Sequence, residues 1–141
     1  MVRTALLLGA LAVTTVLGSD AALADVRLEC DVEGPRDISL SARYEERTRT
    51  GRQKFSAEFE AAPRAGYTAG QRMVMIVDGV NVGSVLLKTV VGGDVQGDLN
   101  LDTAPQSGER PFPANFPEVK SGSRTTVRIA GENILSCRLR P

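Results

Sequence analysis

Apolar and polar residues alternate with a period of two along much of this chain. Three stretches show the alternation most clearly: residues 26–32, 38–43 and 54–60. Side chains of a β-strand point alternately to opposite faces, whereas an α-helix repeats every 3.6 residues. The polar positions are rich in charge, so the pattern predicts half-buried strands of a sheet that has one face in water.

The middle of the chain is more apolar. Residues 73–77 form a continuous apolar run, which predicts a central strand covered on both faces. Asp78-Gly79 follows this run, and the dipeptide favours a two-residue hairpin turn because both positions must adopt positive φ. We therefore expect the chain to reverse direction at this point.

Two further turns are predicted after that hairpin. The return strand is expected over Val80–Val91 with a bulge or bend at Gly83, and Gly92-Gly93 then turns the chain into a strand over residues 95–101. Together with residues 73–77, these strands are predicted to form a three-stranded meander.

A long irregular segment separates the meander from the last two predicted strands. Residues 103–122 contain four prolines, and a proline cannot donate to the hydrogen-bond ladder of a central strand. Strands are expected again over residues 125–129 and 134–139. The total of eight or nine short strands, with no convincing helix, predicts an all-β antiparallel sandwich or small barrel.

The N-terminus is typical of a secretory signal peptide. Arg3 precedes a short apolar run, and Ala22-Leu23-Ala24 matches a signal-peptidase site. The apolar run is shorter than the roughly 20 residues that span a bilayer. We predict that residues 1–24 are removed, leaving residues 25–141 as a single β-domain that is secreted or periplasmic.

The two cysteines, Cys30 and Cys137, lie near opposite ends of the predicted mature chain. In an oxidising compartment an even pair predicts a disulfide, here with a single possible intramolecular connectivity. The bond would join the first and last strands, which are expected to be neighbours or to face each other across the core.

Charge and composition exclude several classes of function. The chain has 17 basic and 17 acidic residues, and loss of Arg3 and Asp20 with the signal peptide leaves 16 of each, so a nucleic-acid-binding role is not expected. There is no histidine, which removes Ser-His and Cys-His catalysis and the usual zinc ligand sets. We predict no enzyme activity, no metal and no cofactor.

Three segments of the chain carry a recognisable sequence pattern. The segments Val77-Asp78-Gly79-Val80-x-Val82-Gly83, Gly97-Asp98-Leu99-Asn100-Leu101-Asp102-Thr103 and Pro111-Phe112-Pro113-x-x-Phe116-Pro117 carry the pattern. Over roughly residues 70–130 they resemble an uncharacterised family of small secreted bacterial β-domain proteins. The resemblance implies a fold type and a bacterial source, and no activity.

Two surfaces are candidates for binding a protein partner. Phe112 and Phe116 in the proline-rich segment either cap the core, which is favoured, or offer a small docking surface. Arg47 and Arg49 lie in a basic stretch, residues 43–54, which is expected to be a solvated loop between two strands or a contact for an anionic surface.

Oxygen-bearing side chains also alternate at Asp98, Asn100 and Asp102, a spacing found in calcium-binding loops. Thr103 stands where such a loop needs glycine, so the favoured interpretation is the wet face of a strand. The leading functional hypothesis is a non-catalytic domain that binds or stabilises a protein partner at the cell envelope. The alternatives are a calcium-dependent binding module and an inhibitor of an extracytoplasmic enzyme that presents residues 44–53.

Overall fold

The computed structural model describes residues 24–141, which form nine β-strands in two antiparallel sheets. Sheet A has the strand order β1 (Val26–Gly34), β2 (Ile38–Arg47), β3 (Arg52–Ala61), β7 (Val95–Asp102) and β6 (Lys88–Thr89). Sheet B has the order β5 (Val80–Leu86), β4 (Arg72–Val77), β8 (Arg124–Ile129) and β9 (Glu132–Arg138). A single turn of 3-10 helix, η1 (Pro63–Ala65), follows β3. The predicted signal peptide lies outside the described residues except for Ala24.

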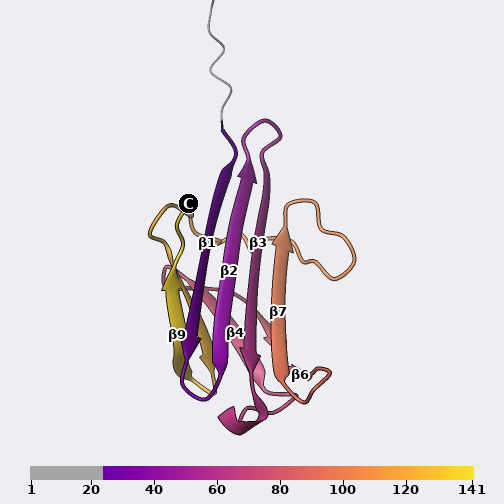
Figure 1. Cartoon of the computed structure of the whole chain (residues 1–141). Coiled ribbons are helices and arrows are strands. Elements are labelled where there is room, and N and C mark those ends of the chain that lie inside the picture. The colour runs from indigo at the N-terminus through magenta and orange to yellow at the C-terminus, as the bar shows by residue number, and fades with distance from the viewer. Residues whose placement is uncertain (1–23) are drawn as a thin grey trace, which may run out of the picture.

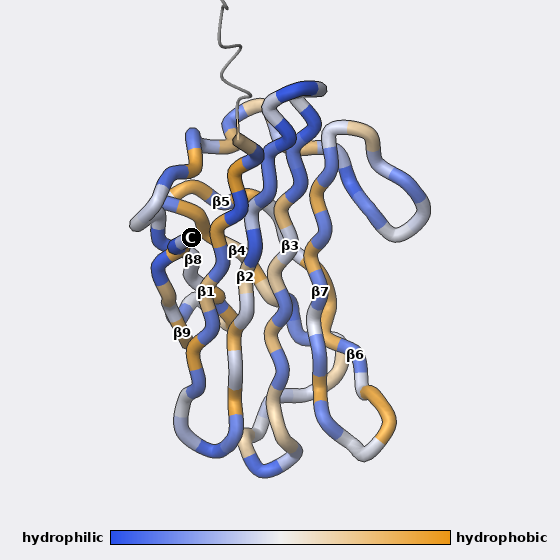
Figure 2. Tube along the Cα trace, turned by 45° about the horizontal axis from the view of Figure 1, so that its top comes forward, coloured by the Kyte–Doolittle hydropathy of each residue, from blue (hydrophilic) through white to orange (hydrophobic). Residues whose placement is uncertain are grey.

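The two sheets pack face to face (Figure 1) and bury one face of each sheet between them. Figure 2 shows the predicted alternation of hydrophilic and hydrophobic residues along β1, β2, β3 and β7. The largest fully buried side chains come from both sheets: Phe55, Phe59, Leu40, Met73, Met75, Leu87 and Leu99. The all-β antiparallel prediction is therefore confirmed, in the form of a sandwich-like pair of sheets.

The Asp78-Gly79 turn between β4 and β5 forms as predicted. Asp78 has φ 44° and Gly79 has φ 81°, so both residues are in the left-handed region that a type I′ turn requires. The predicted irregularity near Gly83 is also present, because the register of β4 against β5 shifts between Met75 and Ile76.

The predicted meander is wrong in its second half. The return strand ends at Leu86, and the chain then crosses from sheet B to sheet A, where β6 pairs with β7. Leu87 makes the crossing and is buried in the core. Gly97 lets the sheets approach each other here, since a Cβ atom on it would lie 2.8 Å from Leu87 Cδ2.

The prediction that residues 73–77 are covered on both faces holds in part, because four of the five residues are buried and Val74 is partly exposed. Strand β4 is central in sheet B, and Met73, Met75 and Val77 enter the core. Val74 and Ile76 point to the other face of sheet B; Ile76 is buried but lies outside the core cluster. The outward side of this apolar strand is therefore partly open at Val74 and covered at Ile76.

The edge strands β1 and β9 are joined as the cysteines predict. Cys30 and Cys137 form a disulfide with their Cα atoms 5.9 Å apart, within the usual range for such a bond. Glu29 and Arg140 exchange two backbone hydrogen bonds of 2.8 and 3.0 Å beside it. The first and last strands lie at one edge of the sandwich, in different sheets (Figure 1).

The sheets differ in strand length, and this difference creates the end of the molecule that carries most candidate residues. Strands β2 and β3 have ten residues each, whereas β4 and β8 have six. The β2–β3 hairpin therefore projects past sheet B (Figure 1). Residues 103–123, the predicted proline-rich segment, connect β7 to β8 and pack against the inner side of this projection.

Candidate functional site

Phe112 and Phe116 cap the open end of the sandwich. The ring of Phe116 lies 5.6 Å from that of the core residue Phe55, and the ring of Phe112 lies 4.6 Å from that of Phe116. Both phenylalanines are half-buried and pack against the core. The favoured interpretation of these residues as a cap fits this packing, and their partly exposed edges line a surface groove.

This groove, which we call the end groove, separates the proline-rich segment from the projecting hairpin. It has a volume of about 560 Å³ and is open to solvent. It is lined by Tyr44, Glu46, Gln53, Phe112, Pro113, Phe116, Pro117, Glu118 and Val119. Its floor is thus largely aromatic and proline side chains, with carboxylates on two sides.

Tyr44 anchors the hairpin wall of the end groove. Its hydroxyl donates a 3.0 Å hydrogen bond to Glu46 Oε2. Burial, together with this carboxylate acceptor, raises the pKa of the Tyr44 phenol above its usual range. The phenol therefore remains protonated and acts as a fixed donor, not as a general base.

Arg47 and Arg49 lie at the tip of the same hairpin. Arg47 ends β2, and its carbonyl oxygen accepts hydrogen bonds from the Thr50 and Gly51 amides, which closes a tight turn. Both arginines are exposed, and among residues 24–141 neither forms an ion pair. We call this pair the tip arginines.

The other basic residues of segment 43–54 are not part of an open loop. Residues 44–47 belong to β2 and residues 52–54 to β3, so the exposed loop is shorter than predicted. Arg43 Nε donates a 3.1 Å hydrogen bond to Glu29 on the surface of sheet A. The expected basic patch is therefore reduced to the tip arginines.

Asp102 is the most strongly held charged residue, which the predicted wet strand face did not anticipate. Its carboxylate is 1% exposed and accepts hydrogen bonds from Arg52 Nη2 at 2.9 Å and Nε at 3.2 Å. Lys54 Nζ lies 3.2 Å away, and the Ala104 amide donates at 2.8 Å. The hydrogen bonds from Arg52 hold the pKa of Asp102 well below its usual range despite burial.

The Asp98-Asn100-Asp102 spacing comes from strand alternation. Leu99 and Leu101 are buried, Asp98 and Asn100 are exposed, and Asp102 is committed to its two cations. No group of three or more acidic or cysteine side chains in residues 24–141 is arranged to hold a metal ion. The spacing thus provides no set of free ligands for calcium.

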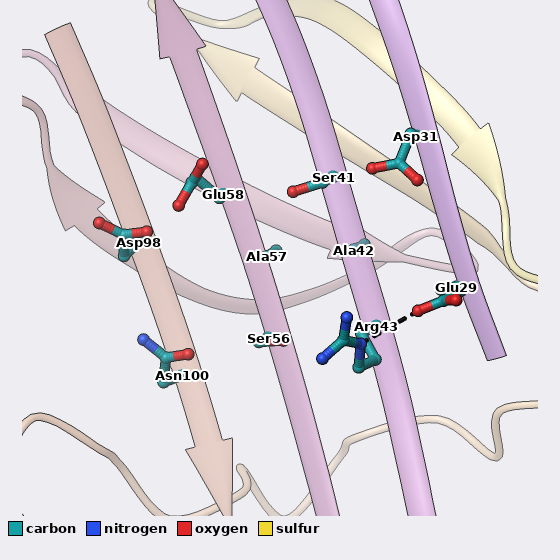
Figure 3. Close-up of a pocket in the computed structure, with 10 residues that line it drawn as sticks. All are labelled: Glu29, Asp31, Ser41, Ala42, Arg43, Ser56, Ala57, Glu58, Asp98 and Asn100. Atoms are coloured by element: carbon teal, nitrogen blue, oxygen red, sulfur yellow. Dashed lines mark hydrogen bonds and ion pairs between the residues drawn. The ribbon is translucent and has the colours of Figure 1, made fainter. Parts of the chain in front are cut away.

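A second depression, the trough, lies on the outer face of sheet A (Figure 3) and has a volume of about 310 Å³. Small residues form its floor, including Ser41 of β2 and Ser56 of β3. Asp31 lies on one side, and Glu58 and Asp98 lie on the other (Figure 3). Sequence alternation indicated that each of these residues is exposed, but only the strand order brings the three carboxylates together.

Among residues 24–141, no helix is both long enough and apolar enough to cross a membrane. Comparison of the chain with protein-family models, curated proteins and solved structures finds no match. The resemblance of residues 70–130 to a secreted bacterial family stays a prediction.

Proposed function

We propose that this chain is a non-catalytic, extracytoplasmic domain that binds a protein partner at the cell envelope through the end groove and the tip arginines. The observation that carries the proposal is the end groove itself. It combines partly exposed aromatic and proline side chains with an adjacent pair of unpaired arginines, and aromatic residues and arginine are enriched at protein interfaces.

The chemistry of the groove indicates the form of the partner. Its floor suits an apolar side chain of an extended segment, because Phe112, Phe116 and Val119 leave apolar surface in contact with water. The tip arginines suit carboxylates of the same partner, since guanidinium groups bind carboxylates in bidentate geometry. A partner with an apolar anchor beside an acidic residue meets both requirements.

The disulfide and the missing histidine support the other parts of the proposal. A disulfide persists in an oxidising compartment, which agrees with the predicted signal peptide. The chain has no histidine, and the Tyr44 phenol and the Asp102 carboxylate are held in fixed hydrogen bonds. In the proposed domain, the Tyr44 phenol and the Asp102 carboxylate have structural roles.

Affinity capture from a cell-envelope extract tests the proposal. Phe112 is the informative position, because its ring contacts that of Phe116 and no core ring directly, whereas the ring of Phe116 contacts that of the core residue Phe55. The Phe112→Ala variant and the Arg47→Glu/Arg49→Glu variant should each reduce recovery of the same partner by about tenfold or more. Both variants should keep a melting temperature close to that of the wild type.

Two control variants make this test specific. Val91→Ala removes a fully exposed apolar side chain from the loop between β6 and β7, and Lys88→Glu reverses an exposed charge on β6. Both controls should capture the partner as the wild type does. Recovery that is unchanged in the Phe112 and tip-arginine variants, or equally reduced in the controls, would refute the proposed surface.

A further inference from the structure

The outer face of sheet B carries four arginines and no ion pair. We call these residues the basic face: Arg72 of β4, Arg124 and Arg128 of β8, and Arg138 of β9. All four are exposed, and none forms a salt bridge within residues 24–141. The side chains of Arg72, Arg128 and Arg138 donate to neutral groups; for example, Arg128 Nε donates to Asn133 Oδ1 at 2.9 Å and Arg138 Nη1 to the Gly122 carbonyl at 2.8 Å. The backbone amide of Arg124 donates to Asp78 Oδ1 at 2.8 Å.

The arrangement of these arginines costs stability. Arg124 and Arg138 are direct cross-strand partners in the register of β8 and β9. Like charges at such positions repel each other. The nearest carboxylates of sheet B, Asp78 and Glu132, lie in its turn and at a strand end. The fold does not account for so concentrated a positive charge.

Between the arginines the same face is neutral and partly apolar. Val74 of β4 is partly exposed there and the neighbouring Leu86 of β5 is 50% exposed, whereas Ile76 on the same side is 7% exposed. Thr126 and Ser136 satisfy each other with a 2.7 Å hydrogen bond and need no outside partner. An apolar strip bordered by arginines has the composition of a protein interface, and it explains why the sequence of β4 is typical of a strand covered on both sides.

The outer face of sheet A has the opposite charge. We call its five carboxylates without a cationic partner the acidic face: Asp31, Glu33, Glu58, Glu60 and Asp98. Three of them follow one row of the register, in which Asp31 pairs with Ser41, Ser41 with Glu58, and Glu58 with Asp98. Figure 3 shows this row lying across the trough.

Crowding of like charges is visible in this row. Gln96 Nε2 donates to Glu58 at 2.8 Å and to Asp98 at 3.4 Å, so a neutral amide is their hydrogen-bond partner. Burial, and then the hydrogen bond shared with Asp98, raise the pKa of Glu58. A cation placed over the trough would relieve this repulsion.

We propose that copies of this chain associate face to face, with the basic face of one copy on the acidic face of the next. The two faces point away from each other on opposite sides of the sandwich, so every copy presents both. An acidic partner would match only the basic face and a basic partner only the acidic face, whereas a second copy matches both, in agreement with the net charge of zero. Because the contact joins two different faces, each copy keeps one face free for a further copy. The copies therefore add one after another along a single direction.

Charge reversal on one face at a time tests this proposal. The Glu58→Lys/Asp98→Lys variant changes the charge of the acidic face from −5 to −1, and the Arg124→Glu/Arg138→Glu variant changes the charge of the basic face from +4 to 0. Each variant replaces one like-charged cross-strand pair with another, so folding stability should change little. Thermal melting checks this point before association is compared.

Sedimentation velocity measures the association. At about 10 mM salt, where the Debye length is about 30 Å, the wild-type protein should sediment faster as its concentration rises, and about 1 M salt should abolish the effect. Each reversed variant alone should associate at least about tenfold more weakly. An equimolar mixture of the two variants should restore association, because the unaltered basic face of the first variant then meets the unaltered acidic face of the second.

Three outcomes would overturn the proposal. The first is a wild-type protein that stays monomeric at low salt at every accessible concentration. The second is association that survives both reversals, or that the mixture fails to restore. The third is a monomeric wild-type protein that binds vesicles containing an anionic phospholipid through the basic face. The Arg47→Glu/Arg49→Glu variant should still associate normally, which separates this surface from the end groove and the tip arginines.

Discussion

The outer face of sheet A has two halves that differ in whether their carboxylates form ion pairs. In the half near the hairpin tip, carboxylates have cationic partners: Glu29 pairs with Arg43, and Asp102 with Arg52 and Lys54. In the other half, the carboxylates of the acidic face have none within residues 24–141. The comparison indicates that the ion pairs of the first half contribute to folding, whereas the unpaired half is the surface that we propose for contact with a second copy.

The paired half also explains how the proline-rich segment is held. The Asp102 carboxylate joins the start of β3, through Arg52, to the start of the loop, through the Ala104 amide. The backbone amide of Asp102 is held as well, because its N–H donates to the Arg110 carbonyl at 2.9 Å. These contacts position the end groove.

The largest expected difference between the halves is in the response to an aspartate-to-asparagine change. Asp102→Asn removes the charge that Arg52 and Lys54 share, and should lower the free energy of unfolding by about 2 kcal/mol. Asp98→Asn makes the same change on the same strand in the unpaired half, and should leave stability equal or slightly higher. Chemical denaturation of both variants measures the effect, and equal losses would contradict the division into halves.

The pH dependence of stability should differ in sign between the halves. The folded-state pKa of Asp102 lies below its unfolded value of about 3.9, so its contribution is present above that pH and is lost as the pH falls further. The pKa values of Glu58 and Glu60 are raised in the folded state, so stability falls as the pH rises above about 4.3 and these groups ionise.

Denaturation midpoints measured over a pH series separate the two contributions. The Asp102→Asn variant should lose less stability than the wild type below about pH 4. A Glu58→Gln/Glu60→Gln variant should lose less between about pH 4 and 6. Identical profiles for all three proteins would contradict the assignment of these residues.

The smallest expected effect is a gain of stability. Glu58→Gln removes one charge from the row that contains Asp31 and Asp98, and should raise the free energy of unfolding by about 0.3 kcal/mol at neutral pH and low salt, because like charges across strands repel. Arg43→Ala, which breaks an exposed pair with Glu29, should instead lower it by about 0.5 kcal/mol. A higher free energy of unfolding for Arg43→Ala than for Glu58→Gln would contradict the division of this face into a paired and an unpaired half.

Much of the fold could be predicted from local sequence patterns. Strand alternation, the Asp78-Gly79 turn and the two cysteines each depend on neighbouring residues or on a single possible pairing. The strand predicted over Val80–Val91 is interrupted because the chain leaves sheet B after Leu86 and pairs with β7 of sheet A from Lys88. The apolar residues around Leu87 give no local sign of this change.

Much of the arrangement of the site residues could not be predicted without the tertiary structure. Phe112 and Phe116 could be recognised as cap or surface residues from the proline-rich context. The burial of Asp102 could not, since its partner Arg52 lies 50 residues earlier in the chain. The acidic and basic faces likewise follow from the strand order, which places carboxylates of β1, β3 and β7 in one sheet and the arginines of β4, β8 and β9 in the other.

The most direct test of the central claim follows backbone amide chemical shifts of isotope-labelled protein as it is diluted at low salt. The account predicts concentration-dependent shifts in two separate groups of residues, one around Asp31, Glu58 and Asp98 and one around Arg124 and Arg138. Both groups should stop moving at about 1 M salt, where the Debye length is about 3 Å. Shifts confined to one of the two faces, or centred on Arg47, Arg49 and Phe112, would contradict association through oppositely charged faces.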